Sequence, residues 1–280
     1  MLKTILDLTI AIPVKNEENN LSGCLDAIGN NFARKIVIID SGSTDSTVSI
    51  AKEYGVEVID FKWNGQFPKK RNWFLRNHAP QTKWVLFLDA DEYLTEEFKN
   101  EVRHALSFEN YKGYWLKYSI YFLGKKLKGG YPLDKLALFQ VGSGEYEKID
   151  EQQWSHLDME IHEHPILNGK TGIIKSKIDH RDFHGVSHYI KKHDQYANWE
   201  ALRYLNRKSG GQLRASWTWK QKIKYKLMET PLVGPLFFVG SFILMGGFRD
   251  GARGFAFAIL KSSYFTQIYC KIKELELSLK

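Results

Sequence analysis

Residues 35–45 read KIVIIDSGSTD, a β-branched apolar run that ends in Asp40 and passes into a polar turn. A short run that is apolar throughout is typical of a strand buried on both faces of a parallel sheet. A helix is predicted from Ser46 to Tyr54, and the next apolar run, residues 56–59, is a second strand. A strand, a helix and another strand in this order predict a βαβ unit and an α/β fold.

The same alternation continues on both sides of this unit. A strand is predicted at residues 9–14, and the helix after it has apolar residues at helical spacing: Leu21, Cys24, Leu25 and Ile28. A further helix covers residues 69–77, and WVLFLD at residues 84–89 is a strand that ends in an acid. We therefore predict a mostly parallel sheet with helices on both faces, in which Cys24 is a core residue rather than a nucleophile.

The composition narrows the class of protein. The chain has 280 residues, of which 43% are hydrophobic and 26% charged, which is typical of a globular protein and excludes disordered, collagen-like and coiled-coil classes. Cys24 and Cys270 are the two cysteines, so a disulfide framework is not expected and a reducing compartment is. The net charge of +8 and the aromatic content of 14% predict an anionic partner, for which nucleic acid and anionic lipid both qualify at this level.

The alternation of strands and helices ends near residue 112, where aromatic and β-branched segments are separated by Gly-rich turns. These segments predict mixed or antiparallel strands that complete the sheet. Residues 188–207 follow as an amphipathic helix. We therefore predict a nucleotide-binding-type α/β half at 1–110, a second half that completes the sheet at 111–186 and a C-terminal helical region at 187–280.

The stretch from Pro231 to Phe248 carries no charge and follows a basic segment at residues 220–226. Its length is at the edge of what spans a bilayer, but two prolines and four glycines argue against a regular spanning helix. We predict a shallow or re-entrant membrane element beside anionic head groups, and the alternative is a buried helical hairpin. The N-terminus shows no signal-peptide pattern, so we expect a cytoplasmic protein that is peripheral on the inner face of the membrane.

Acidic residues follow three of the predicted strands, at residues 13–17, 40–45 and 89–92. The carboxyl ends of parallel strands meet at one edge of a sheet, where ligands bind. Asp89 and Asp91 are two residues apart, and two carboxylates so close favour a cation between them, with magnesium or manganese preferred by hard oxygen ligands. The alternative is that these acids cap the following helix, since Glu92, Glu96 and Glu97 lie around the pair.

Three cations, Lys69, Lys70 and Arg71, stand at a predicted helix start, where the helix dipole disfavours positive charge. A bound diphosphate would stabilise both the cations and the free N–H groups there. The alternative is a solvated basic face. Neither a P-loop nor a G-x-G-x-x-G motif is suitably placed, so ATPase and dinucleotide-binding functions are not expected.

Four motifs in order make the sequence resemble family 2 glycosyltransferases: IAIPVKNEE at 10–18, IIDSGSTD at 38–45, KRN at 70–72 and LDADE at 88–92. Three later motifs resemble the branch that contains bacterial lipopolysaccharide-core β-glucosyltransferases: IHE at 161–163, IDH at 178–180 and GFRDGARGF at 247–255. The resemblance implies a GT-A fold and inverting transfer from a nucleotide-activated sugar, usually linked to UDP. It makes residues 1–110 the nucleotide-sugar-binding half and residues 111–186 the acceptor-side half of the GT-A domain, followed by the helical, membrane-associating region at 187–280.

The resemblance also implies roles for the residues that match these motifs. Pro13 and Glu17 would lie beside the base and ribose, and Asp40 would accept a hydrogen bond from the pyrimidine ring. Arg71 would lie near the base or diphosphate, and Asp89 would face the ribose. Many members carry a second acid at the position of Ser41, but one acid for the base remains.

The resemblance places the divalent metal, Mn²⁺ or Mg²⁺, on Asp91, with His180 completing its shell. Inverting transfer also needs one general base for the acceptor hydroxyl. We predict Glu163 for this role because it belongs to the acceptor side of the chain, with Asp150, Glu151 and Asp182 as competitors. A zinc site is not expected, because the histidine spacing matches no H-E-x-x-H pattern.

The sequence thus predicts a metal-dependent, membrane-associated inverting glycosyltransferase. Its donor would be a UDP-sugar, glucose first among the candidates, and its acceptor a lipid-linked or lipopolysaccharide-core molecule. A second hypothesis keeps the fold but transfers another sugar in capsule, O-antigen or polyprenyl-linked glycan assembly. A third is a catalytically inactive adaptor that binds nucleotide or membrane. No nucleic-acid partner is expected, since the sequence carries no RNA- or DNA-binding motif.

Overall fold

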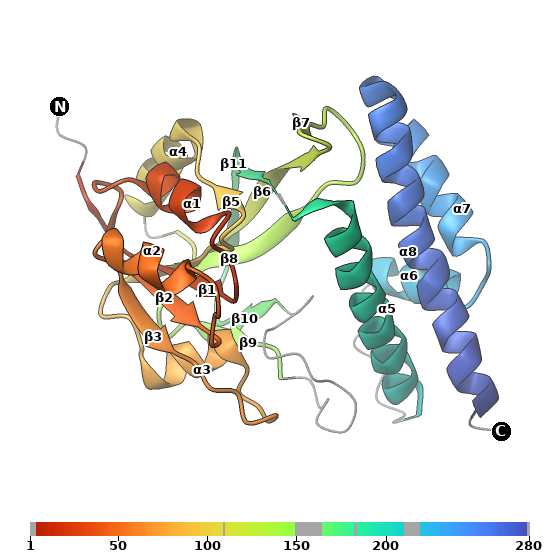
Figure 1. Ribbon diagram of the computed structural model, residues 1–280, viewed down its shortest axis with the longest axis horizontal. Coiled ribbons are helices and arrows are strands. Elements are labelled where there is room, and N and C mark those ends of the chain that lie inside the picture. The colour runs from red at the N-terminus through yellow and green to blue at the C-terminus, as the bar shows by residue number, and fades with distance from the viewer. Residues whose placement is uncertain (1–3, 109, 149–163, 182–183, 210–218, 279–280) are drawn as a thin grey trace. The chain divides into compact units, whose positions relative to one another are not determined.

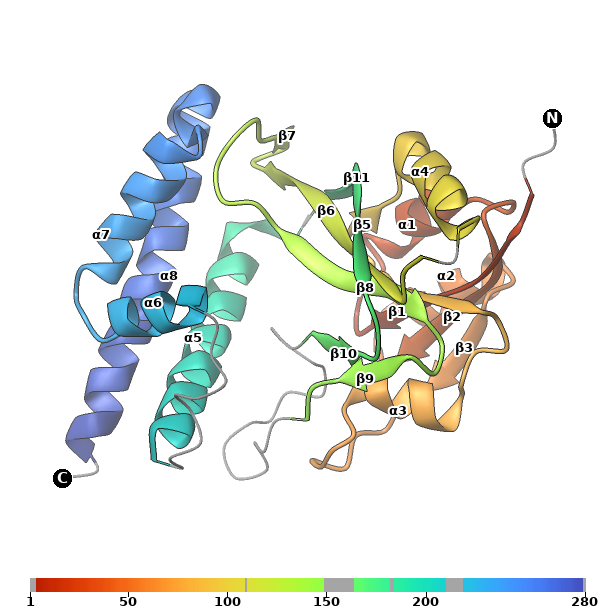
Figure 2. The same ribbon diagram turned by 180° about the vertical axis from the view of Figure 1, so that it is seen from behind.

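The computed structural model describes residues 4–108, 110–148, 164–181, 184–209 and 219–278 (Figures 1 and 2). The described chain divides into two compact units. The sheet unit holds the residues up to 181 except 122–132, and the helical unit holds 122–132 together with the residues from 184 onward. Each unit has its own hydrophobic core.

The first half of the sheet unit is parallel. Its strands, in spatial order, are β3 (Glu57–Asp60), β2 (Ala33–Asp40), β1 (Leu6–Val14) and β4 (Trp84–Phe87). Val14 of β1 lies opposite Asp40 of β2, so the two strands end at the same edge of the sheet. The predicted βαβ unit is confirmed by the helix α2 (Thr47–Glu53), which connects the parallel strands β2 and β3.

The second half of the sheet is mixed. It continues from β4 through β8 (Asp134–Gln140), β6 (Gly113–Phe122) and β11 (Thr171–His180) to the short strand β5 (Glu92–Tyr93). β8 is antiparallel to both of its neighbours, whereas β6 and β11 run parallel. β9 (Gly144–Tyr146) and β10 (Pro165–Leu167) form a separate antiparallel ribbon. The mixed sheet predicted from residue 112 onward is confirmed.

Helices cover both faces of the sheet, as predicted (Figure 1). Alternate residues of β1, such as Leu8, Ile10 and Ile12, pack in one core cluster with α1 (Leu21–Ile28), α2 and α4 (Glu96–Leu106). Ala11 points to the other face, where it joins a cluster with Phe74 of α3 (Lys70–Asn77). Burial of each large apolar side chain stabilises the fold by about 1.5–3 kcal/mol.

The helical unit contains α5 (Gly185–Ser209), α6 (Trp219–Met228), α7 (Val233–Phe238), the π-helical turn η1 (Val239–Leu244), the 3₁₀ turn η2 (Gly247–Asp250) and α8 (Gly251–Ser278), with the two-residue strand β7 (Lys125–Lys126). Ala197, Ala201 and Tyr204 of α5 pack against Ile268 and Ile272 of α8. The helix predicted at 188–207 is confirmed within α5.

None of the helices in the described ranges is both long and apolar enough to cross a membrane by itself. One bent pair, Val233–Leu244 followed by Gly247–Ser278, meets the length and composition criteria together, with an angle of 71° at the break. Gly246 stands at the break with a φ of +73°, a conformation that favours glycine. The predicted interruption of the uncharged stretch is therefore present, while its membrane contact stays a prediction.

Candidate active site

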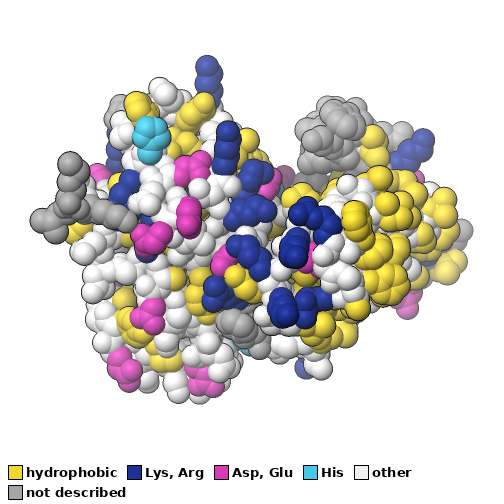
Figure 3. Space-filling view, turned by 90° about the horizontal axis from the view of Figure 1, so that it is seen from above, with side chains coloured by type: hydrophobic (Ala, Val, Ile, Leu, Met, Phe, Trp, Pro, Cys, Tyr) yellow, Lys and Arg dark blue, Asp and Glu magenta, His cyan; other side chains and the backbone are white. Residues whose placement is uncertain are grey.

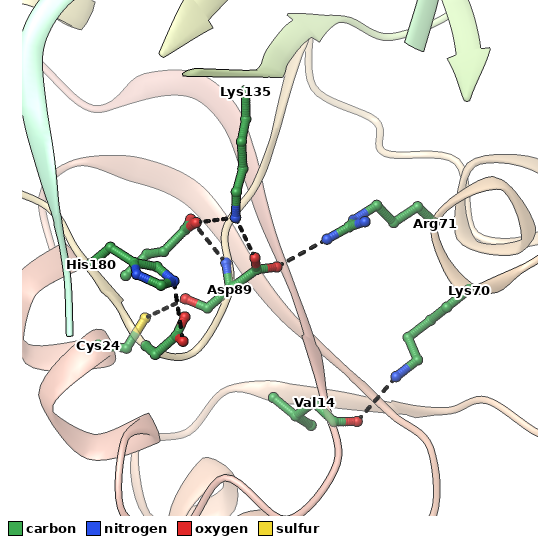
Figure 4. Close-up of polar contacts among 9 residues, drawn as sticks. Val14, Cys24, Lys70, Arg71, Asp89, Lys135 and His180 are labelled. Carbon is green, nitrogen blue, oxygen red and sulfur yellow. Dashed lines mark hydrogen bonds and ion pairs between the residues drawn. The ribbon is translucent and has the colours of Figure 1, made fainter. Parts of the chain in front are cut away.

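The candidate site lies at the edge of the sheet where β1, β2 and β4 end. Figure 4 shows the polar contacts around Asp89 at this site. Asp40 is the last residue of β2, and Asp89 follows β4 by two residues. The segment LDADE at residues 88–92 follows the fully buried strand β4 and forms a turn at the edge of the sheet. This is the position expected for a ligand site in an open α/β sheet.

Two cations hold the carboxylate of Asp89. Its Oδ1 is 2.9 Å from Nη2 of Arg71, and its Oδ2 is 2.6 Å from Nζ of Lys135. Arg71 comes from the first turn of α3 and Lys135 from β8, so the contacts join distant parts of the sequence. Figure 4 shows Asp89 between these two side chains. Asp89 and Arg71, both predicted to bind the donor, are therefore neighbours.

Glu92 closes the turn that follows Asp89. Its Oε2 accepts a hydrogen bond from the backbone N–H of Asp89 at 3.1 Å, and its Oε1 is 2.5 Å from Nζ of Lys135. Burial raises the pKa of Glu92 to about 7, against the opposing effect of Lys135. Burial lowers the pKa of Lys135, but the carboxylates of Asp89 and Glu92 outweigh it and raise that pKa well above its usual value. Lys135 therefore stays cationic.

Glu96 and Glu97 lie in the first turn of α4, as the capping alternative expected, but Asp89, Asp91 and Glu92 precede that helix and do not cap it. The N-cap of α4 is Thr95, whose Oγ1 accepts a hydrogen bond from the backbone N–H of Phe98 at 3.2 Å. Cys24 lies beneath the turn as the predicted core residue, with Sγ 3.9 Å from the carbonyl oxygen of Asp89. Burial raises the pKa of its thiol well above the usual value, which makes it unreactive.

Asp91 meets His180, the other predicted metal ligand. Oδ2 of Asp91 is 3.3 Å from Nε2 of His180, which is the last residue of β11 and pairs in register with Glu92. Burial lowers the pKa of His180, but the Asp91 carboxylate outweighs it and raises the pKa above its usual value. Among the described residues, no group of three or more His, Cys, Asp and Glu side chains is arranged to hold a metal.

Asp40 is engaged in its own turn. Asp40 as a residue is 4% exposed, and its carboxylate accepts hydrogen bonds from the backbone N–H groups of Gly42 at 2.9 Å and Ser43 at 3.0 Å, and from the Ser43 hydroxyl. Gly42 has a φ of +77°, which this tight turn requires. The structure therefore gives Asp40 a turn-forming role, and its predicted contact with a pyrimidine stays a prediction.

The loop after β1 is joined to the loop after β2. The amide oxygen of Asn16 accepts a hydrogen bond from the backbone N–H of Thr44 at 2.8 Å, and the backbone N–H of Glu17 donates to Oγ1 of Thr47 at 2.7 Å. The Glu17 carboxylate accepts a hydrogen bond from the Asn20 amide at 2.8 Å. Pro13 is buried in β1, so Pro13 and Glu17 both lie near the end of the strand that pairs with Asp40.

The basic residues at the start of α3 are built into the site. Lys69 and Lys70 are 5% and 3% exposed, so the alternative of a solvated basic face is wrong. Nζ of Lys70 donates to the carbonyl oxygen of Val14 at 3.2 Å (Figure 4). Asn72 binds the backbone of Tyr146 through two hydrogen bonds, and the Tyr146 ring lies 5.4 Å from the Arg71 guanidinium carbon.

Arg181 forms a second cluster next to Asp91. Its backbone N–H donates to the Asp91 carbonyl oxygen at 2.8 Å, and its guanidinium donates to Oδ2 of Asp179 at 3.1 Å. The guanidinium lies between the rings of Tyr93 and Tyr121, at 5.1 Å and 4.8 Å from their centroids. Asp179 also accepts a hydrogen bond from the Tyr121 hydroxyl at 2.9 Å.

The predicted general base cannot be placed. Glu163 and its competitors Asp150, Glu151 and Asp182 lie outside the described residues. Sequence reasoning missed Lys135 and Tyr146. Each is one residue of a strand, and the site residues that it contacts belong to other elements. Their sequence context, a lysine beside an apolar run and one aromatic among many, contained no signal that could have found them.

The model of the family Glycosyl transferase family 2 matches residues 9–161, which are more than half of the chain. An uncharacterized glycosyltransferase of Rickettsia typhi is 32% identical over 128 residues, 44% of this chain and 42% of that relative. The SPbeta prophage-derived glycosyltransferase SunS of Bacillus subtilis is 33% identical over 97 residues, 34% of this chain and 22% of that protein. The matches therefore span less than half the length of these curated relatives.

Two solved structures have a more distant likeness. That of S. aureus TarS 1–349 is matched over 97% of this chain and 91% of that chain, with 13% identity and a TM-score of 0.46. Glucosyl-3-phosphoglycerate synthase from Mycobacterium tuberculosis, in complex with Mn²⁺, UDP and glucosyl-3-phosphoglycerate, is matched over 42% of this chain and 44% of that chain, with 21% identity and a TM-score of 0.32. The family assignment rests on the family model and not on these structures.

Proposed function

The chain belongs to glycosyl transferase family 2, and from that premise we propose that it is a metal-dependent inverting glycosyltransferase. The donor is a UDP-sugar, with glucose the first candidate, and the acceptor is a lipid-linked molecule such as a lipopolysaccharide core. The observation that carries the proposal is the turn after β4, in which Asp89 is bound by Arg71 and Lys135 while Asp91 meets His180.

The start of α3 supports the diphosphate part of this proposal. Arg71 and Lys70 come from the first turn of the helix, and both side chains face residues at the ends of neighbouring strands. A helix N-terminus with added cations is a suitable site for a diphosphate. The two ion pairs of Asp89 hold its carboxylate in one position, which suits a hydrogen-bond acceptor for ribose hydroxyls.

The residues present fit a divalent metal of the manganese or magnesium class. Such ions commonly take one or two protein ligands and complete their shell with substrate phosphates and water. Asp91 and His180 supply an oxygen and a nitrogen whose side chains are 12% and 22% exposed and already lie together. A bound ion would neutralise the charge that develops on the leaving diphosphate.

The acceptor hydroxyl must lose a proton to a general base on the face opposite the leaving group, because the reaction inverts the anomeric centre. Glu163 is the residue that we propose for this step. The lipid acceptor and the peripheral position on the inner face of the cytoplasmic membrane are proposed from the net charge of +8 and the uncharged stretch from Pro231 to Phe248.

The experiment is a transfer assay with radiolabelled UDP-sugars and a bacterial lipid extract, run with Mn²⁺ or with a chelator. We expect transfer of one sugar that requires the metal and is lost in Asp91→Asn. The matched control is Asp7→Asn, which removes an exposed carboxylate paired with Arg34 at the start of β1. Transfer that proceeds equally in the chelator or in Asp91→Asn would overturn the metal-dependent mechanism.

A further inference from the structure

The helical unit has an exposed apolar face (Figure 3). Leu232, Leu236, Val239 and Ile243 follow the spacing of one helical face along α7 and η1 and are 42–57% exposed. The apolar turn, residues 243–248, continues this face with the exposed residues Leu244, Met245 and Phe248. Leu244 is 80% exposed. Exposed apolar residues that gather in this way mark an interaction surface.

Packing fixes which side of α7 faces outward. A Cβ atom added at Gly234 would lie 2.0 Å from Oγ1 of Thr266, so α7 approaches α8 more closely than a larger residue allows. The Ser262 hydroxyl donates to the carbonyl oxygen of Gly234 at 2.8 Å. Because this side of α7 is held against α8, the apolar residues on its other side stay exposed.

The lysine loop, residues 123–130, is attached to the apolar turn. Residues 123–130 contain three exposed lysines, Lys125, Lys126 and Lys128. The Asp250 carboxylate accepts hydrogen bonds from the backbone N–H groups of Lys128 at 2.9 Å and Gly129 at 3.1 Å. The backbone N–H of Gly130 donates to the Met245 carbonyl oxygen at 2.9 Å. The loop is therefore held beside the apolar turn, and Figure 3 shows basic side chains next to the apolar face.

The net positive charge of the chain is concentrated in residues 184–280, which form most of the helical unit. Residues 184–280 contain sixteen Lys and Arg against six Asp and Glu, a net charge of +10 in a chain whose total is +8. An apolar face bordered by cations complements a surface that is anionic outside and apolar within. A bilayer that contains anionic lipids has this arrangement.

We propose that the apolar turn 243–248 and the lysine loop 123–130, locked together by Asp250, form one membrane-docking surface. Leu244, Met245 and Phe248 enter the acyl boundary, while the lysines and Arg249 contact the lipid phosphates. The proposal deepens the proposed function, on which it rests for the lipid-linked acceptor, and it adds a loop from the middle of the chain to the C-terminal membrane element.

The test is flotation of the full chain with vesicles of phosphatidylcholine and phosphatidylglycerol. The variant Lys125→Ala/Lys126→Ala/Lys128→Ala should bind about a hundredfold more weakly, since each cation near an anionic surface changes affinity by roughly fivefold. The variant Leu244→Ser/Phe248→Ser should lose at least about tenfold, because it removes two large apolar side chains from the lipid contact. The matched control is Lys52→Ala/Lys83→Ala/Lys170→Ala, which removes three exposed lysines of the sheet unit and should bind like the unchanged chain.

The outcomes distinguish an anionic membrane from a second copy of the chain as the partner of this face. Equal flotation of the two lysine variants, or no flotation of the unchanged chain, would overturn the membrane surface. Light scattering that detects a dimer dissociated by Leu244→Ser/Phe248→Ser, without vesicle binding, would assign the face to a second copy. Stabilisation by UDP with Mn²⁺ is measured on the same samples, so a failure of the donor site is distinguished from a failure of the docking surface.

Discussion

The side chain of Lys135 connects the two acids that shape the turn after β4. It reaches Asp89 at 2.6 Å and the buried Glu92 at 2.5 Å, and it lies 5.2 Å from the centre of the Tyr118 ring. A buried carboxylate that loses its cation costs more than the pair itself contributes, because the remaining charge stays desolvated. Lys135 is therefore a positioning residue for the whole turn.

We expect Lys135→Ala to lower the free energy of unfolding by about 3 kcal/mol at pH 8, where Glu92 is ionised in the unchanged chain; this magnitude is typical when a buried carboxylate loses its cation. Urea unfolding measures this loss. Lys117→Ala is the control, since Lys117 pairs with Asp134 at 3.2 Å and both side chains are about one third exposed or more. The control should lose less than about 1 kcal/mol. Equal small losses in both variants would contradict the positioning role.

The titration of Glu92 gives a pH-dependent prediction. Its pKa is about 7 in the folded chain, where burial raises it from the usual 4.5. The folded state therefore binds the proton more tightly, and the stability that Glu92 contributes is complete below pH 4.5 and is lost as the pH rises through 7. We expect Glu92→Gln, which cannot ionise, to gain about 3 kcal/mol relative to the unchanged chain between pH 4.5 and 8.

Glu101 provides a control of opposite sign for this experiment. Burial raises the pKa of Glu101, but hydrogen bonds from the backbone N–H groups of Lys175 and Ser176 outweigh it and lower the pKa. Glu101→Gln should therefore become relatively less stable as the pH rises. Urea unfolding in a chelator at several pH values measures both variants. A stability difference for Glu92→Gln that does not change with pH would refute the assignment.

At the scale of elements, the position of the lysine loop depends on the carboxylate of Asp250. Asp250 binds two backbone N–H groups of this loop, and each hydrogen bond to a charged group contributes about 1.5–3 kcal/mol. We expect Asp250→Ala to release the loop and to make limited trypsin digestion faster after Lys125, Lys126 and Lys128. Mass spectrometry of the fragments identifies the cleavage site.

The control for the loop prediction is Asp194→Ala. Asp194 pairs with Lys271 at 2.8 Å between α5 and α8, on a partly exposed surface. Its loss changes the charge by the same amount but releases no backbone N–H group of the loop. If both variants are cut equally slowly within residues 125–128, Asp250 does not hold the loop.

The sequence predicted elements whose signals are local. The alternation of strands and helices placed β1, β2, β3 and β4 correctly, and the acids at strand ends located the turn with Asp89 and Asp91. Asp91 and His180 were paired by the family resemblance, and the structure brings them to 3.3 Å. Of the basic residues at the start of α3, Arg71 pairs with Asp89, while their predicted contact with a diphosphate stays a prediction.

Contacts between distant segments could not be predicted in this way. Lys135 meets Asp89 only because β8 inserts beside β4 in antiparallel order, and no periodicity in either strand encodes that order. The attachment of loop 123–130 to the turn after η1 depends on close glycine packing, in which a Cβ at Gly129 would lie 2.1 Å from the Gly246 carbonyl oxygen. The hydrogen bonds that the Asp40 carboxylate accepts from the backbone of its own turn were not predicted either, and its contact with a base stays a prediction.

At the scale of the whole molecule, charge is divided along the chain. Residues 1–183 contain 24 Lys and Arg against 26 Asp and Glu, whereas residues 184–280 have a net charge of +10. The residues of the candidate site lie in the first part, where acidic and basic residues are nearly equal in number. The basic excess therefore belongs to the part that we propose to meet an anionic membrane, and not to the proposed diphosphate site.

The most direct test of the proposed donor site is thermal unfolding of the full chain with UDP, GDP and CDP, each with and without Mn²⁺. We expect UDP with Mn²⁺ to raise the melting temperature, because a ligand that binds the folded state alone stabilises it by mass action. Asp91→Asn should abolish this rise and Asp7→Asn should keep it. If no nucleotide raises the melting temperature, or if Asp91→Asn responds like the unchanged chain, the donor site is not at the turn after β4.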